Sequence, residues 1–357
     1  MNELTAKQIY VMIFFIPLVY KMASLPALLY GETSATSYIL IGIIVAIEFI
    51  QLAAVLLIAN KGGMEGIKEK YGAKVYCLLS IPILFVIFIK TILFTKEIVI
   101  YVCRFLFYNI DEVSILMIVL VVVFYLGVKG VRAVGRLFEI AVWLIPLIII
   151  FGVFFGELQL ESGYLTPLFE DGFSTYSSTV GKFLIYTFDF SPLLYAKIKI
   201  KKARNIVVCS ILSTLTVIFC YALLYSAYGN ASVLASYGFA RLGTFHTVVS
   251  EIGSLDWPSS ILWLMVAVLS LSFKINAVDR IMKEFKIPKI GTALFLIGAS
   301  IVLILKIETI ADAIQLVTGG IQYAVFACEI VVPLIVLILY AIKENTNKEN
   351  KIYATQN

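Results

Sequence analysis

Long apolar runs alternate with short polar connections along the chain, and this alternation is the strongest pattern in the sequence. A helix needs roughly 20 apolar residues to cross a hydrocarbon core about 30 Å thick. The third apolar run is too long for one perpendicular crossing, so we expect either a tilted helix or an end, with Lys96, Glu97 and Arg104, that extends past the core. We predict ten membrane spans, at residues 8–30, 36–59, 75–104, 113–129, 134–156, 181–199, 205–229, 257–280, 290–307 and 321–342.

The composition agrees with a lipid environment. Of the 357 residues, 61% are hydrophobic and 14% are charged, and the mean hydropathy is +0.99. Soluble domains are nearer half apolar and a quarter charged. We therefore expect an all-α membrane protein whose solvent is the lipid bilayer.

The positive charge is divided among short clusters between the apolar runs, so the net charge of +5 does not form a nucleic-acid-binding face. If the N-terminus is cytoplasmic, 20 of the 28 lysines and arginines fall in inner connections. This bias predicts that both termini are cytoplasmic in a multi-pass protein of the cytoplasmic membrane. The inner residues are Lys7, Lys61, Lys68, Lys70, Lys74, Lys129, Arg132, Arg136, Lys197, Lys199, Lys201, Lys202, Arg204, Arg280, Lys283, Lys286, Lys289, Lys343, Lys348 and Lys351.

The domain organisation follows from the same pattern. The longest outer connections, 157–180 and 230–256, are too short for a core of their own. Residues 1–343 are therefore expected to form a single transmembrane domain. The polar tail at residues 344–357 is expected to be disordered in the cytoplasm.

Ionisable residues deep in the spans are the first candidates for function, because each is costly in lipid unless it faces the protein interior or water. Lys90 and Lys274 could instead extend their ammonium groups to the membrane surface. Glutamate is too short to do so from the middle of a span, which indicates a paired or protonated Glu48. The six residues are Lys21, Glu48, Lys90, Asp189, Lys274 and Glu329.

Two of these charges stand beside prolines. Lys21 precedes Pro26 in the first span, and Asp189 precedes Pro192 in the sixth. Proline removes a backbone donor and interrupts a helix. Transporters built from five-plus-five inverted repeats place broken helices first in each half, so we predict a LeuT-like fold with broken helices 1 and 6. Two ordinary proline kinks are the simpler alternative.

The two breaks together predict a ligand site for a small amino acid or amine. Its carboxylate would face Lys21 and its ammonium Asp189, while Glu48, Lys274 and Glu329 would serve as coupling or network charges. His246 is the single histidine and has no metal-ligand or nucleophile set around it, so we expect no catalytic residue, metal or cofactor. The predicted ligand-binding residues are Lys21, Met22, Ala23, Ser24, Leu25, Thr187, Asp189, Phe190 and Ser191, with helix breaks at Pro26 and Pro192.

Several stretches resemble a known family. They are LTAKQ at residues 4–8 with SLP at 24–26, GVRAVGRLFEI at 130–140, LTPLFEDG at 165–172 and GKF at 181–183. The chain is similar to the B subunits of bacterial spore nutrient-germinant receptors, within the amino acid–polyamine–organocation transporter superfamily. Many relatives have a glycine-rich break in the first helix, where this chain has Met22, Ala23 and Ser24; Lys21 is expected to supply the positive charge instead.

The resemblance implies a ligand-binding subunit that senses a nutrient in the spore inner membrane, with the other receptor subunits as partners. Proton-coupled transport of amino acids or amines is the main alternative, with Glu48 or Asp189 as the group that titrates. A passive pore on the same fold also stays open, whereas nothing in the sequence favours a membrane-embedded enzyme.

Overall fold

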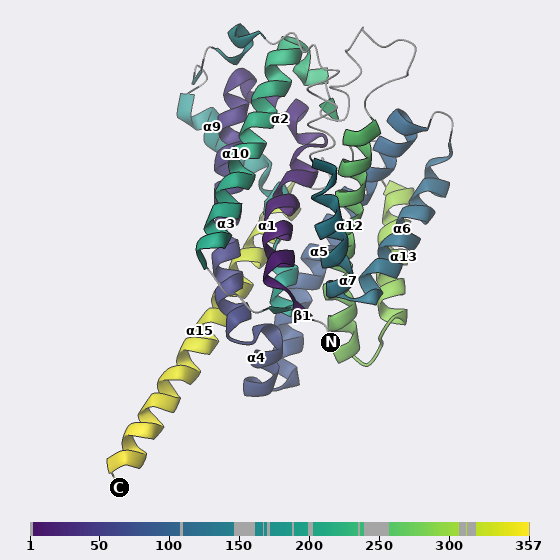
Figure 1. Cartoon of the computed structure of the whole chain (residues 1–357). Helices are drawn as coiled ribbons and strands as arrows, with labels where there is room; N and C mark the ends of the chain where they lie inside the picture. The colour runs from purple at the N-terminus through teal and green to yellow at the C-terminus, as the bar shows by residue number, and fades with distance from the viewer. Residues whose placement is uncertain are drawn as a thin grey trace.

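The structure is a computed structural model that describes residues 3–107, 110–145, 161–166, 168–169, 172–187, 189–198, 203–234, 236–238, 257–306, 312 and 319–356. Long helices run roughly side by side along one direction, with α1 inside the bundle (Figure 1). α1 packs against α7, α10 and α12, and α3 packs against α10 and α15. The first span therefore lies among helices from both halves of the chain.

The first apolar segment forms two helices rather than one. α1 (Ala6–Lys21) begins with a capping box, in which the Gln8 backbone N–H donates to the Thr5 hydroxyl and the Gln8 side chain accepts from the Thr5 N–H. It ends at Lys21, and α2 (Leu25–Thr33) starts after a turn at residues 22–24. Pro26 occupies the first turn of α2, where its missing N–H costs nothing.

The sixth segment is interrupted more extensively. α9 (Gly172–Lys182) is followed by two short 3₁₀ helices, η4 (Leu184–Tyr186) and η5 (Ser191–Tyr195), with a turn between them that contains Thr187 and Asp189. Pro192 lies in the first turn of η5. Both prolines thus begin a new helical piece, as their fixed φ favours.

Most of the other long helices cover predicted spans, whereas α4 forms in the connection between the second and third. Residues 146–156, 188, 199 and 307 of three predicted spans lie outside the described residues. The elements are η1 (Ser34–Thr36), α3 (Ser37–Asn60), α4 (Gly63–Tyr71), α5 (Ala73–Tyr101) with the π-helical turn η2 (Val102–Leu106), α6 (Glu112–Lys129), α7 (Val131–Ala141), η3 (Ser162–Leu165), α10 (Ala203–Tyr228), η6 (Gly229–Leu234), α12 (Trp257–Glu284), α13 (Ile290–Lys306) and α15 (Gly320–Gln356).

Six helical stretches in the described part of the chain are long and apolar enough to cross a membrane, and Ile290–Ile304 is a shorter apolar helix. This confirms an all-α, multi-pass membrane protein. The first and sixth predicted spans are not among the six stretches because each is interrupted, and an interrupted segment has no continuous helix of spanning length. The six are Leu25–Asn60, Ala73–Arg104, Glu112–Lys129, Ala203–Leu234, Ser260–Glu284 and Gly320–Lys343.

The polar tail is part of the last helix in the structure. α15 continues without a break to Gln356 and projects beyond the bundle (Figure 1). Extending a formed helix by one residue costs far less than nucleating a new one, so an apolar helix can carry a polar extension.

A small parallel ladder joins two distant parts of the chain. β1 (Glu3–Leu4) pairs with β2 (Lys197–Ile198), with Glu3 opposite Lys197. β1 leads into α1, and β2 follows η5. The start of the first interrupted segment and the end of the second are therefore held together by backbone hydrogen bonds.

Candidate functional site: two helix breaks and a buried charge network

The backbone carbonyls at the first break are largely occupied by other parts of the protein. The Tyr221 hydroxyl, from α10, donates to the Lys21 carbonyl. The Tyr237 N–H donates to the Ala23 carbonyl at 3.0 Å. Interrupting a helix frees such carbonyls, and a buried carbonyl needs a donor. Side chain and backbone donors thus stabilise the break, and these two carbonyls are already engaged.

The Glu48 carboxylate connects the two breaks. Its Oε2 lies 2.6 Å from the ammonium of Lys21, the last residue of α1, and both side chains are fully buried. Its Oε1 accepts a hydrogen bond from the backbone N–H of Asp189 at 3.1 Å. One carboxylate in the middle of α3 therefore contacts both the end of α1 and the turn of the sixth segment, so Glu48 is paired with Lys21 in the structure.

Asp189 is surrounded by ammonium groups. Its Oδ1 lies 3.0 Å from Lys274 of α12 and 3.4 Å from Lys90 of α5. Lys90 also contacts Oε1 of Glu329, from α15, at 3.1 Å, and donates to the Thr187 carbonyl. Neither lysine extends to the membrane surface, because both are about 99% buried in this cluster.

The six charges predicted from the sequence thus form one network, which we call the ion network. It contains three ammonium and three carboxylate groups and draws them from α1, α3, α5, the sixth segment, α12 and α15. Burying a single charge costs several kcal/mol, whereas an arrangement balanced in charge and hydrogen-bonded avoids most of that cost. The members are Lys21, Lys90, Lys274, Glu48, Asp189 and Glu329.

A stacked aromatic pair covers part of the network. The rings of Tyr20 and Phe94 are parallel within 4°, with centroids 3.4 Å apart. The Lys274 ammonium lies 5.0 Å from the Tyr20 centroid and 4.9 Å from that of Phe94. Cation–π attraction adds to the ion pair with Asp189 and fixes the position of Lys274.

Sequence reasoning missed one buried acid. Glu97 was expected near or past the membrane surface, but its side chain is fully buried. Its Oε1 accepts hydrogen bonds from the hydroxyls of Ser24, at the first break, and Tyr186, in η4, the latter at 2.9 Å. The helical spacing of Lys90, Phe94 and Glu97 (i, i+4, i+7) places them on one face of α5, and that spacing was the available signal.

The other predicted ligand-binding residues lie at the two breaks and differ in burial and in the residues they contact. Ala23, Ser24, Leu25, Thr187, Phe190 and Ser191 are buried, and Met22 is partly buried. The Phe190 ring packs near Phe49 of α3, with centroids 6.2 Å apart. Glu48 and Glu97 each contact residues of both interrupted segments. Lys21 and Asp189 do not form an ion pair with each other.

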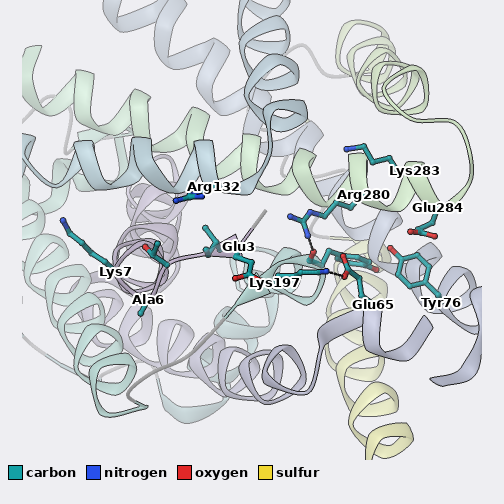
Figure 2. A pocket seen from close by; sticks show the side chains of 13 residues that line it. Glu3, Ala6, Lys7, Glu65, Tyr76, Arg132, Lys197, Arg280, Lys283 and Glu284 are labelled. Carbon is teal, nitrogen blue, oxygen red and sulfur yellow. Dashed lines mark hydrogen bonds and ion pairs between the residues drawn. The ribbon is translucent and has the colours of Figure 1, made fainter. Parts of the chain in front are cut away.

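A large cavity opens at the end of the bundle that carries the N-terminus. We call it the terminal cavity; its volume is about 920 Å³. Figure 2 shows charged side chains of both signs around it. Lys197 pairs with Glu65 at 2.8 Å across its wall, and Arg280 donates to the Tyr195 carbonyl. Its lining residues are Glu3, Leu4, Thr5, Ala6, Lys7, Glu65, Tyr76, Arg132, Tyr195, Lys197, Arg280, Lys283 and Glu284.

The terminal cavity adjoins elements that also carry the ion network. Arg280 lies on α12, six residues after Lys274, or roughly 9 Å along the helix. Tyr195 ends η5, in the same segment as Asp189. Within the described residues, no group of three or more His, Cys, Asp or Glu side chains is arranged to hold a metal ion.

Together, the fold and the site define a polytopic membrane protein of the receptor or transporter type, with two interrupted helices around a buried ion network. The family model described as "Spore germination protein" matches residues 3–313. The chain therefore belongs to this family of spore germination proteins. This is a membrane family of receptor or transporter type and not a family of enzymes. Comparison with curated proteins finds no match.

Proposed function

We propose that the chain is the ligand-binding membrane subunit of a spore germinant receptor and senses a small nutrient, such as an amino acid, between the two helix breaks. The observation that carries this proposal is the double contact of Glu48, which holds Lys21 and the Asp189 N–H at the same time. A solute that alters either contact alters both breaks. Binding would thereby favour one of two helix packings.

The fold supports the same proposal. Interruptions after Lys21 and after Lys182 are those that a five-plus-five inverted repeat places first in each half. We propose such a LeuT-like, ten-helix arrangement. The pocket comprises the residues around the breaks, from Lys21 to Leu25 and from Thr187 to Ser191, with the ion network as its support.

The proposed membrane location follows from the family, and the proposed orientation follows from the distribution of positive charge. We place the protein in the spore inner membrane, with both termini on the cytoplasmic side and the other germinant-receptor subunits as partners. The distribution of lysine and arginine supports this orientation, and both termini lie toward the same end of the molecule (Figure 1). The terminal cavity would then open to the cytoplasm.

The test is a thermal-shift screen of the detergent-purified protein against amino acids, purines and sugars, because a solute that binds the folded state raises its melting temperature. Lys21→Met and Asp189→Asn should each abolish the shift. The matched control is Lys182→Gln, which removes a half-exposed partner of Glu32 and should leave it unchanged. Normal shifts in both network variants would reject this site.

Proton-coupled transport is the second candidate, and one observation favours it. Glu97 is buried and has no basic partner among the described residues, as is often the case for a proton-carrying group in a membrane. The sequence had suggested Glu48 or Asp189 for this role, but lysines pair with both. Uptake of labelled amino acids into proteoliposomes, driven by a pH gradient, distinguishes transport from sensing alone.

A further inference from the structure

Glu97 stands at the junction of the two interrupted segments. The Ser24 and Tyr186 hydroxyls both donate to its Oε1, and these two hydroxyls also lie 3.2 Å from each other. The Tyr237 hydroxyl donates to the backbone carbonyl of Glu97 at 2.9 Å. Tyr237 in turn donates its N–H to Ala23 of the first break. A change of charge on the Glu97 carboxyl group would therefore alter one hydrogen bond from each interrupted segment directly.

Glu97 differs from every other buried acid in the described chain. Glu48, Asp189, Glu329 and Asp279 each lie within ion-pair distance of a lysine. Among the described residues no lysine or arginine pairs with Glu97, and no donor reaches its Oε2. One oxygen of this fully buried carboxyl group thus has no hydrogen-bond partner in the described part of the chain.

None of the described groups that contact the Glu97 carboxyl supplies a positive charge. The titratable side chains that interact electrostatically with it include four phenols: Tyr186 from η4, Tyr20 from α1, Tyr221 from α10, and Tyr237. Its neighbour Lys96 pairs instead with Glu112 at 2.8 Å. A carboxylate buried among neutral groups is strongly disfavoured. Two hydroxyl donors offset only part of that cost, so the site favours an added positive charge.

We propose that Glu97 is the cation-accepting group of the solute site and takes one positive charge at a time. In the ligand-free protein it holds a proton. When a nutrient with a primary ammonium group binds, that ammonium pairs with Oε2, the O–H bond of the carboxylic acid breaks and the proton leaves to bulk solvent. Glu97 together with the cation it holds is neutral before and after, so the exchange leaves no uncompensated charge on its carboxyl group.

This inference rests on the proposed function and specifies its ligand class, an amino acid or another primary amine. It also assigns the ligand's ammonium group to Glu97 rather than to Asp189, whose carboxylate already pairs with Lys90 and Lys274. Because Ser24 and Tyr186 belong to different breaks, replacing a proton with an ammonium group would change both hydrogen bonds at once. The exchange is thereby a route from binding to helix movement.

Infrared spectroscopy of the ligand-free protein tests the protonation directly. The difference spectrum between wild type and Glu97→Gln should show the C=O stretch of a carboxylic acid at neutral pH, and Ser24→Ala should move this band to higher frequency because one hydrogen bond is lost. The control is Glu112→Gln, which removes the half-exposed first residue of α6, the partner of Lys96 on α5. A difference spectrum with only carboxylate bands would overturn the proposal.

A binding experiment tests the exchange. Each of the common amino acids is paired with the carboxylic acid that lacks its amino group, and both are screened by thermal shift. For each amino acid that binds, calorimetry in buffers of different ionisation enthalpy should count about one proton released by wild type. Glu97→Gln should release none and bind at least tenfold more weakly, while Glu97→Asp should keep the release.

The outcomes distinguish a failure of the proposed function from a failure of the proposed role of Glu97. If no solute in either screen stabilises the protein, the proposed function fails, whereas the infrared band still decides whether Glu97 holds a proton. If amino acids bind but Glu97→Gln leaves affinity and proton count unchanged, or if the analogues without an amino group bind equally well, the cation-accepting role of Glu97 is wrong.

Discussion

The ammonium of Lys21 lies 2.6 Å from Oε2 of Glu48, with both side chains fully buried. Removing one partner of such a pair leaves an uncompensated buried charge, which costs about 3 to 5 kcal/mol. We predict that Lys21→Met and Glu48→Gln each lower the melting temperature strongly. The double variant should recover much of that loss, because it removes both charges while the glutamine oxygen can still accept from the Asp189 N–H.

Thermal unfolding of the four proteins in one detergent measures this coupling as a double-mutant cycle. The control cycle uses Lys182 and Glu32, whose side chains are 46% and 37% exposed and 2.6 Å apart. Exposed pairs contribute roughly 0 to 1 kcal/mol, so this cycle should show little coupling. Additive effects of Lys21→Met and Glu48→Gln would contradict the pairing.

The contact of α4 with η5 depends on a glycine. A Cβ atom at Gly63 would lie 2.6 Å from the Leu194 carbonyl oxygen, and its φ of +60° favours glycine. We predict that Gly63→Ala destabilises the protein by at least about 1 to 2 kcal/mol, from the left-handed conformation alone. Gly181→Ala is the matched control, since a Cβ there meets nothing within 4 Å. Equal melting temperatures for the two variants would refute this packing.

Lys68, on α4 outside the spanning helices, has a raised pKa because the Glu284 carboxylate hydrogen-bonds its ammonium at 2.6 Å. A raised lysine pKa adds stability that is fully present below the ordinary pKa and is lost as pH rises through the raised value. We predict a small decrease in melting temperature for Lys68→Gln at neutral pH that vanishes in strong alkali and shrinks in high salt.

Melting curves of Lys68→Gln and wild type across this pH range check the sign, with Lys74→Gln as a control on the neighbouring helix. A difference that grows in alkali would show that Lys68 acts through something other than its ammonium. The pair joins α4 to the end of α12, so its loss should also raise proteolysis near residue 72.

The end of α15 provides a test of the domain boundary. We predict that deleting residues 344–357 leaves the melting temperature unchanged, because the domain was assigned to residues 1–343. Deleting from residue 335 onward should destabilise the protein, since it removes Tyr340, which is fully buried and donates to the Gly63 carbonyl at 2.8 Å. A stability loss from the shorter deletion would extend the domain into the tail.

Hydropathy and proline positions were enough to predict the lipid environment, most helix ends, and the interruptions near Pro26 and Pro192. They also identified the six charges of the ion network, because a charge in an apolar run must face the interior whatever its partner is. These are local properties. They depend on the residue, its neighbours along the chain, and the free energy of placing it in lipid.

Only the tertiary structure decided which charges pair. Lys21 could have met any of the three acids; it meets Glu48 because α1 and α3 bring those two residues together, while Asp189 is left to Lys90 and Lys274. The depth of Glu97 was also hidden, since a glutamate near the end of a long apolar run resembles a helix that leaves the membrane. Its burial depends on Ser24, Tyr186 and Tyr237, which come from distant segments. Which charges pair depends on which helix faces pack against each other. The order of polar and apolar residues along the chain does not determine that packing.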